Sequence, residues 1–283
     1  MAEEKNSLAV VQQKLLNGVS YESLPETSIA VSRSFEKQFF QKSSYSPIQN
    51  EAICDFNTGA KFLNPRRSYL VLKVRSTVAA QGANFGQGSV CNLIKRVVIT
   101  SRSGVELSRT EDYNLLMAKV LRYGCPQDWL DKFGQLIGLS DVAAERATTF
   151  QQINDAAATT FMIPLDKLSP FFAGDGKSLV PPPASAGLRV QISFADQKQA
   201  LVSDSAVQSY TVDDIYIMTN LTTMVDSWQK LINEESATQG LTYSYPEWHT
   251  TQSSTAQAST NIEVRKAVAR AMSAFVITKQ LPD

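Results

Sequence analysis

Leu188-Arg-Val-Gln-Ile-Ser-Phe194 is the stretch that decides the fold class. Apolar and polar side chains alternate along it, which predicts a β-strand with one buried and one solvated face, because successive side chains of a strand point to opposite sides. The stretch 68–75 shows the same period of two, and 91–100 is rich in Val and Ile. We therefore expect a mainly all-β, antiparallel protein.

Other segments extend this pattern. Thr160 to Leu165 is predicted to be a strand, and Pro164 places it at an edge or an end because proline cannot donate a ladder hydrogen bond. Ser101 to Gly104 has the composition of a hairpin turn, with a return strand after it.

Towards the C-terminus the pattern is less regular. Within 210–218 the apolar residues change phase, which predicts a β-bulge at Asp213 and Asp214. The stretch 262–278 is expected to be the last strand, although its apolar spacing also fits a helix. Eight or so strands predict one β-sandwich or barrel domain.

The expected organisation has two parts. Residues 1–50 are predicted to be an N-terminal arm with a short helix, and from Ile29 part of it is expected either to lie along a sheet as an edge strand or to be partly disordered. Residues 51–283 are predicted to be a single domain. It carries a helical insertion near 110–160 and a long polar loop at 235–261.

Within the insertion, Tyr113, Met117 and Val120 have helical spacing and predict a first helix. Pro126 suits the start of a second helix, and Ser140 suits the cap of a third that runs to Ala158.

The composition is neutral and polar. Lys plus Arg number 27 and Asp plus Glu number 27, only 19% of residues are charged, and Ser, Thr and Gln number 30, 20 and 20. Such a balance argues against electrostatic steering towards nucleic acid and suits a protein that associates with other chains. The short basic clusters at 65–67 and 95–96 are expected to form ion pairs or a solvated face.

Few residues suit catalysis. The chain has a single His, which excludes a histidine-cluster metal site, and its three Cys are predicted to be free thiols in a reducing compartment. Gly176-Lys177-Ser178 lacks the earlier glycine and the following helix of a phosphate-binding loop. His249 beside Glu247 lacks a recognisable nucleophile. No secretory signal and no transmembrane run are predicted, and we expect a non-enzymatic protein without metal or cofactor.

Tyr243, Tyr245 and Trp248 are the candidate surface contacts, because they lie beside a proline in a polar stretch. Exposed aromatic side chains of this kind suit a sugar platform or a subunit contact. The alternative is a loop that packs on its own domain.

The order of certain phrases is more informative than any single motif. They are Asn64-Pro-Arg-Arg-Ser-Tyr-Leu-Val-Leu, Asn92-Leu-Ile-Lys-Arg-Val-Val-Ile, Gly104-Val-Glu-Leu, Asp112-Tyr-Asn-Leu-Leu, Ile163-Pro-Leu-Asp-Lys-Leu-Ser-Pro-Phe-Phe172, Gly187-Leu-Arg-Val-Gln-Ile and Tyr210-Thr-Val-Asp-Asp-Ile-Tyr-Ile. From about residue 50 to 279 this order resembles the first jelly roll of the major capsid proteins of the double-jelly-roll lineage. Polinton-like viruses, virophages and related double-stranded DNA viruses carry such proteins.

The resemblance implies an eight-stranded jelly-roll β-sandwich that self-assembles into capsomers of an icosahedral virion, in a reducing host compartment. Its partners would be copies of itself, as a trimer or another ring, and penton or cement proteins, without sequence-specific nucleic acid. The family has a second jelly roll, which this sequence does not contain, so either the rest lies outside it or the chain is a single-roll relative. The alternative function is a carbohydrate- or receptor-binding jelly-roll module.

Overall fold

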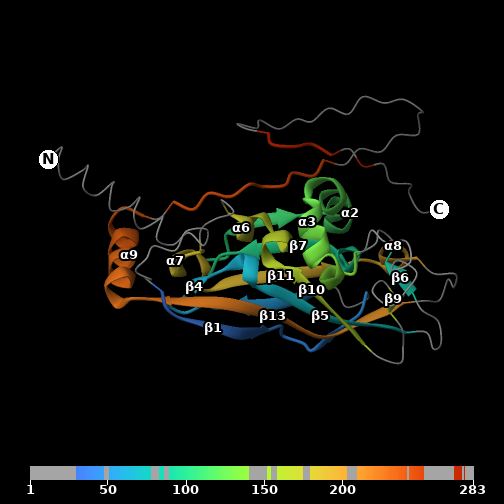
Figure 1. The fold of residues 1–283 in the computed structure, drawn as a ribbon, viewed down its shortest axis with the longest axis horizontal. Coiled ribbons are helices and arrows are strands. Elements are labelled where there is room, and N and C mark those ends of the chain that lie inside the picture. Colours follow the sequence, from blue (N-terminus) through green and yellow to red (C-terminus); the bar gives the residue numbers. More distant parts are fainter. Residues whose placement is uncertain are drawn as a thin grey trace.

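The computed structural model describes residues 30–47, 51–77, 83–85, 89–139, 152–153, 158–174, 179–202, 209–240, 242–251, 271–275 and 277. Two antiparallel sheets pack face to face in it, with most helices gathered on one side and at one end (Figure 1).

The larger sheet has the strand order β1-β13-β5-β10, and the second sheet has the order β3-β11-β7-β8. The bounds of these strands are β1 Ala30–Phe39, β3 Glu51–Phe56, β5 Tyr69–Ser76, β7 Ile94–Thr100, β8 Glu106–Thr110, β10 Thr159–Pro164, β11 Leu188–Phe194 and β13 Tyr210–Met224. Numbered 1 to 8 in chain order, the strands give 1-8-3-6 in one sheet and 2-7-4-5 in the other. This is the order of a jelly roll, which confirms the predicted fold class.

Short elements complete the described part. β2 (Ser44–Tyr45) and β4 (Phe62–Leu63) pair with β13, and a small third sheet has the order β12-β6-β9, from Leu201–Val202, Ala83–Phe85 and Gln152–Ile153. The helices are α2 Tyr113–Lys119, α3 Gln127–Phe133, α5 Leu165–Leu168, α6 Pro170–Ala173, α7 Pro182–Ser185, α8 Gln197–Ala200 and α9 Asp226–Thr238. A π-helical turn, Val120–Gly124, follows α2, and 3-10 turns span Pro65–Arg67, Val90–Leu93 and Gln135–Ile137.

The core lies between the two sheets and follows directly from the alternation. In the second sheet Val190 lies opposite Cys54 on one side and opposite Ile99 on the other, and all three side chains are inaccessible to solvent. In the larger sheet Leu70 lies between Ile217 and Ile163 in the same way. Each such side chain contributes about 1.5–3 kcal/mol by burial.

Several sequence predictions are confirmed. β10 is an edge strand that ends at Pro164, and β7 and β8 form a hairpin in which the Ser101 amide donates to the Val105 carbonyl (2.8 Å). The ladder between β13 and β5 is irregular between Asp213 and Tyr216, which is the expected bulge. The helices near 113–133 also form, with Pro126 as the N-cap of α3.

Other predictions are wrong. For the stretch from Ile29, the edge-strand alternative is confirmed by β1, but the division at residue 50 falls inside the sandwich because β1 is a full strand of the larger sheet. The polar loop does not begin at residue 235, because α9 continues through Thr238. β9 interrupts the helix predicted up to Ala158.

The prediction of a last strand at 262–278 is also wrong for the residues of this range that the structure describes. Residues 271–275 form no strand and are exposed, while 262–270 lie outside the described residues. The eighth strand of the roll is β13, which continues past its expected end at Met218 to Met224.

A buried polar junction holds this extension of β13. The backbone N–H of Asn220 donates to Ser68 Oγ (2.8 Å), and the Ser68 hydroxyl donates to the backbone carbonyl of Asn64 (2.6 Å). The backbone N–H of Asn64 donates in turn to the backbone carbonyl of Asn220 (2.9 Å). These bonds satisfy backbone groups that would otherwise be costly to bury.

Candidate surface-contact site

Residues 242–251, here called the C-terminal strap, follow α9 and run extended across the helical side of the sandwich (Figure 1). The strap joins neither sheet. Its side chains alternate, so that Tyr243 and Tyr245 are half-buried whereas Thr242, Ser244 and Pro246 are exposed. The strap therefore attaches through two aromatic side chains.

Tyr243 and Tyr245 both pack against Phe171, which is buried in α6. Each ring lies 5.3 Å from the Phe171 ring in an edge-on arrangement, a favoured aromatic geometry. The Tyr243 hydroxyl donates to the Phe171 carbonyl (2.7 Å), and the Tyr245 hydroxyl donates to the Leu107 carbonyl on β8. Burial, with a smaller contribution from Glu247, raises the pKa of Tyr245.

The geometry of Gly174 shows how closely Tyr243 is fitted. Gly174 ends α6 with φ +51°, and a Cβ there would lie 2.7 Å from the Tyr243 hydroxyl oxygen. Only glycine combines that backbone conformation with such a close approach.

Trp248 lies in a different environment from the two tyrosines. Its half-buried ring is 6.0 Å from the ring of Phe275, in the described stretch 271–275. The three aromatic residues were predicted to act as one group. In the structure the two tyrosines pack against Phe171, whereas Trp248 lies beside Phe275. Both tyrosine hydroxyls already donate to the chain's own carbonyls, as in a loop that packs on its own domain.

The remaining sequence candidates are not brought together. His249 and Glu247 are both exposed, and the serines that follow them in the chain, Ser253 and Ser254, lie outside the described residues. Gly176-Lys177-Ser178 also lies outside them. Within the described ranges no three His, Cys, Asp or Glu side chains gather as a metal site.

The thiols are free, as predicted. Burial raises the pKa of Cys54 to about 12 and that of Cys91 to about 11, so both are protonated at neutral pH. A protonated, buried thiol is a poor nucleophile.

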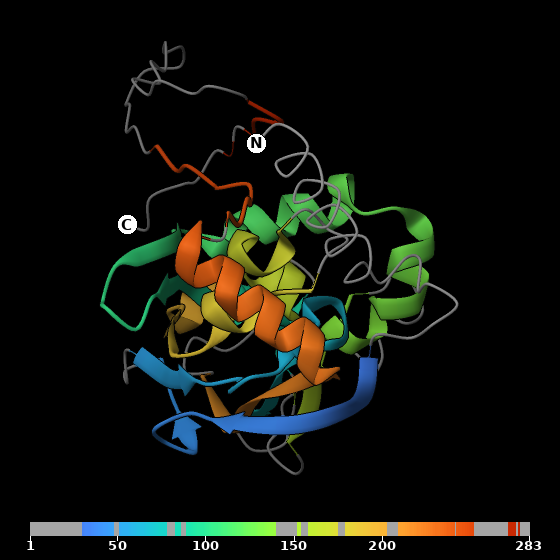
Figure 2. The ribbon, with the colours of Figure 1, turned by 90° about the vertical axis from the view of Figure 1, so that its left-hand side faces the viewer.

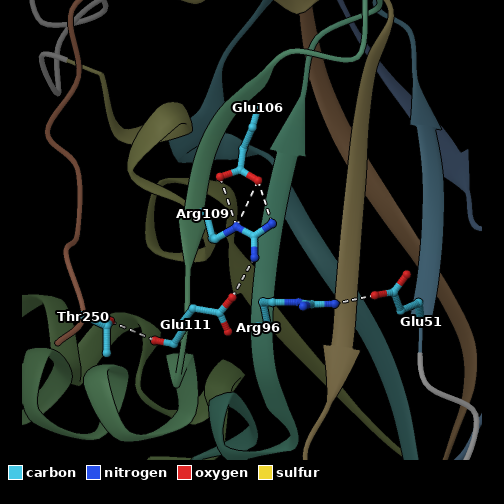
Figure 3. A network of polar contacts seen from close by, with 6 residues as sticks. All are labelled: Glu51, Arg96, Glu106, Arg109, Glu111 and Thr250. Atoms are coloured by element: carbon cyan, nitrogen blue, oxygen red, sulfur yellow. Dashed lines mark hydrogen bonds and ion pairs between the residues drawn. The ribbon is translucent and has the colours of Figure 1, made fainter. Parts of the chain in front are cut away.

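Charged side chains on the outer face of the second sheet pair within the chain (Figure 3). Arg109 donates to both carboxylate oxygens of Glu106 (2.7–3.0 Å) and to Glu111 (3.0 Å), and the Thr250 hydroxyl donates to the Glu111 carbonyl (3.4 Å). Arg96, from one of the predicted basic clusters, pairs with Glu51. Exposed pairs of this kind contribute little to stability, but they neutralise Arg96 and Arg109 within the chain.

Sequence reasoning missed the most unusual surface feature, which is the outward row of β1. Val31, Phe35 and Phe39 are 67%, 64% and 65% exposed. The weak alternation from Ile29 was the signal for this strand, but it did not reveal that the apolar face points outwards.

The fold is a jelly-roll β-sandwich, and the candidate contact residues lie on its C-terminal strap. No helix within the described ranges is long and apolar enough to span a membrane. No family model and no curated protein matches the chain.

Solved structures of viral capsids are similar to it. PBCV-1 VP54 fitted into a reconstruction of the virophage Sputnik has a TM-score of 0.42 at 11% identity, covering 75% of this chain and 46% of that chain. The PBCV-1 virus capsid has a TM-score of 0.38 at 10% identity, with coverages of 75% and 46%. The Sputnik virophage structure has a TM-score of 0.46 at 9% identity, with coverages of 72% and 50%. The chain thus spans about half the length of the structures it matches, and the likeness is one of fold.

Proposed function

We propose that this chain is a viral major capsid protein, a structural and non-enzymatic subunit that associates with copies of itself into capsomers of an icosahedral virion. The observation that carries the proposal is the strand order, 1-8-3-6 over 2-7-4-5, in a chain whose phrases resemble a capsid jelly roll. Penton and cement proteins would be its other partners, and the virion its location.

The composition supports this role physically. Subunits in a shell must remove water from much of their side surface, and neutral polar groups cost less to desolvate than charges. The chain has 27 basic and 27 acidic residues and is rich in Ser, Thr and Gln. On the second sheet, Arg96 and Arg109 are already neutralised by carboxylates of the same chain. A neighbouring subunit would therefore meet a face without unpaired arginines at these positions.

Electron microscopy and native mass spectrometry of the purified protein test the proposal. We expect ring-shaped capsomers whose mass is a small multiple of 31.1 kDa, with three copies as the leading expectation. Val190→Asp is the control, because a carboxylate buried between the sheets should prevent folding and remove ordered capsomers together. Only monomers at every protein and salt concentration would contradict a shell function.

A further inference from the structure

β1 is a ten-residue strand at the outer edge of the larger sheet, where it runs beside β13 (Figure 1; Figure 2 shows it from the end that carries α9). The chain partly covers two other edges. At the β8 edge, the Leu107 and Glu111 carbonyls accept hydrogen bonds from the strap. At the β3 edge, the Ile53 carbonyl accepts a hydrogen bond from the backbone N–H of Gln41 (2.9 Å). Among the described residues, no strand lies on the open side of β1.

The backbone groups that face this open side can be identified. Phe35 lies opposite Asn220 on β13. The backbone N–H and carbonyl of Asn220 both point away from β1, because they bond to Ser68 and Asn64 on the side of β5. Phe35 and Asn220 are therefore a non-hydrogen-bonded pair, and the N–H and C=O of Phe35 point away from β13. Because this direction alternates along a strand, the backbone groups of Arg33 and Lys37 also point to the open edge, where no other described strand lies.

The side chains of β1 are inverted relative to the rest of the sandwich. From Ser34 to Gln38 the half-buried positions are polar. Glu36 pairs with Lys61, and the side-chain amide of Gln38 donates to the Asn57 carbonyl (3.0 Å). The exposed positions carry Val31, Phe35 and Phe39. The row exposes about 300–400 Å² of apolar surface, roughly half of one partner's share of a standard interface.

We propose that β1 is an interface in which the β1 strands of two copies pair antiparallel about a two-fold axis that passes beside Glu36. In this register Arg33 faces the partner's Phe39, and Phe35 faces the partner's Lys37. Every outward residue from 33 to 39 then meets a cation–aromatic partner. Lys37 already makes such a contact within the chain, 4.5 Å above the Tyr216 ring.

The neighbouring register is less favourable. Centring the axis on Phe35 would place Arg33 opposite the partner's Lys37 twice, and like charges directly opposite each other destabilise a strand pair. The chosen register brings two Glu36 carboxylates near each other, but each is already paired with a Lys61 ammonium. Such a two-fold contact closes on two copies and cannot by itself build a capsomer ring, so it is separate from the capsomer contacts.

Cysteine cross-linking tests this register. Glu36 would be a non-hydrogen-bonded pair with itself, with Cα atoms about 4.5 Å apart, which a disulfide can span. Under mild oxidation we expect Glu36→Cys to give a 36–36 disulfide, identified by mass spectrometry. Ser34→Cys and Gln38→Cys should cross-link when mixed but not separately. No 36–36 product above the wild-type background, or equal cross-linking by Ser34→Cys alone, overturns the proposal.

A charge variant tests the interface without added thiols. Phe35→Lys should weaken dimerisation at least tenfold in sedimentation equilibrium, whereas Tyr123→Lys, at an aromatic residue 74% exposed on the insertion, should not. Both side chains are exposed, so both variants should melt near the wild type. An unchanged dimer with Phe35→Lys overturns the proposal. Protection of the Phe35 and Lys37 amides from hydrogen exchange in the diluted monomer also overturns it, because the chain itself would then occupy the edge.

Discussion

Cys54 should make the fold sensitive to alkali. Burial raises its pKa from 9.0 to about 12, with a smaller contribution from the charge of Asp55. Between these values the unfolded chain loses the thiol proton and the folded chain keeps it, so stability falls as pH rises, by up to about 1.4 kcal/mol per pH unit. Urea unfolding from pH 8 to pH 11 should show a shallower decline for Cys54→Ala than for the wild type.

The matched control for this experiment is Cys125→Ala, because Cys125 is only half-buried. Its substitution should change the pH dependence less than that of Cys54. Identical slopes for the wild type and Cys54→Ala would show that the Cys54 thiol does not link folding to pH.

At the scale of elements, the strap depends on Gly174. Gly174→Ala should release residues 242–251, because its Cβ would collide with the Tyr243 hydroxyl, and chymotrypsin should then cleave faster after Tyr243. Gly59→Ala is the control, with φ +59° and no atom within 4 Å of the added Cβ. It should cost only about 1 kcal/mol of backbone strain and leave cleavage unchanged.

A double variant separates the collision from the strain. Adding Tyr243→Phe removes the hydroxyl that the new Cβ meets, so the combined loss of stability should be smaller than the sum of the two single losses. Strict additivity, or equal cleavage in the Gly59 and Gly174 variants, would count against this account of strap docking.

Elements were predictable from the sequence where one face is apolar and buried. β11 and the bulge at Asp213 and Asp214 were found in this way, because a change of phase along a buried strand requires an extra residue. β1 was only an alternative within the arm, since Val31, Phe35 and Phe39 point outwards whereas Ser34, Glu36 and Gln38 point inwards. An alternation of apolar and polar residues looks the same whether the apolar side chains face the core or the solvent.

α9 left a signal that was missed. Trp228, Leu231 and Ile232 have helical spacing and pack with Phe62 and Met224 in a small cluster at the end of the sandwich. The docking of the two strap tyrosines on Phe171 could not have been predicted, because it joins residues about 70 positions apart whose contact only the fold creates.

At the scale of the whole molecule, the jelly-roll order was expected through the resemblance rather than from strand patterns. Alternation shows which face of a strand is buried, but not which strands are neighbours. β1 and β13 pair across some 180 residues, and no local pattern encodes such a contact. The candidate contact surface was only partly predictable for the same reason: its aromatic residues could be named, but not their partners.

The distribution of charge over the whole molecule predicts how its self-association responds to salt. The chain carries no formal net charge at pH 7, and Arg96 and Arg109 on one face, like Lys73 and Arg75 on the other, pair with carboxylates of their own chain. Copies therefore repel each other little, and sodium chloride between about 50 and 500 mM should change the dissociation constant less than about threefold. Sodium sulfate should tighten association, because it strengthens the burial of apolar rows such as that of β1. Sedimentation velocity in the two salts measures both effects, and a tenfold weakening in sodium chloride would show that ion pairs between chains hold the copies together instead.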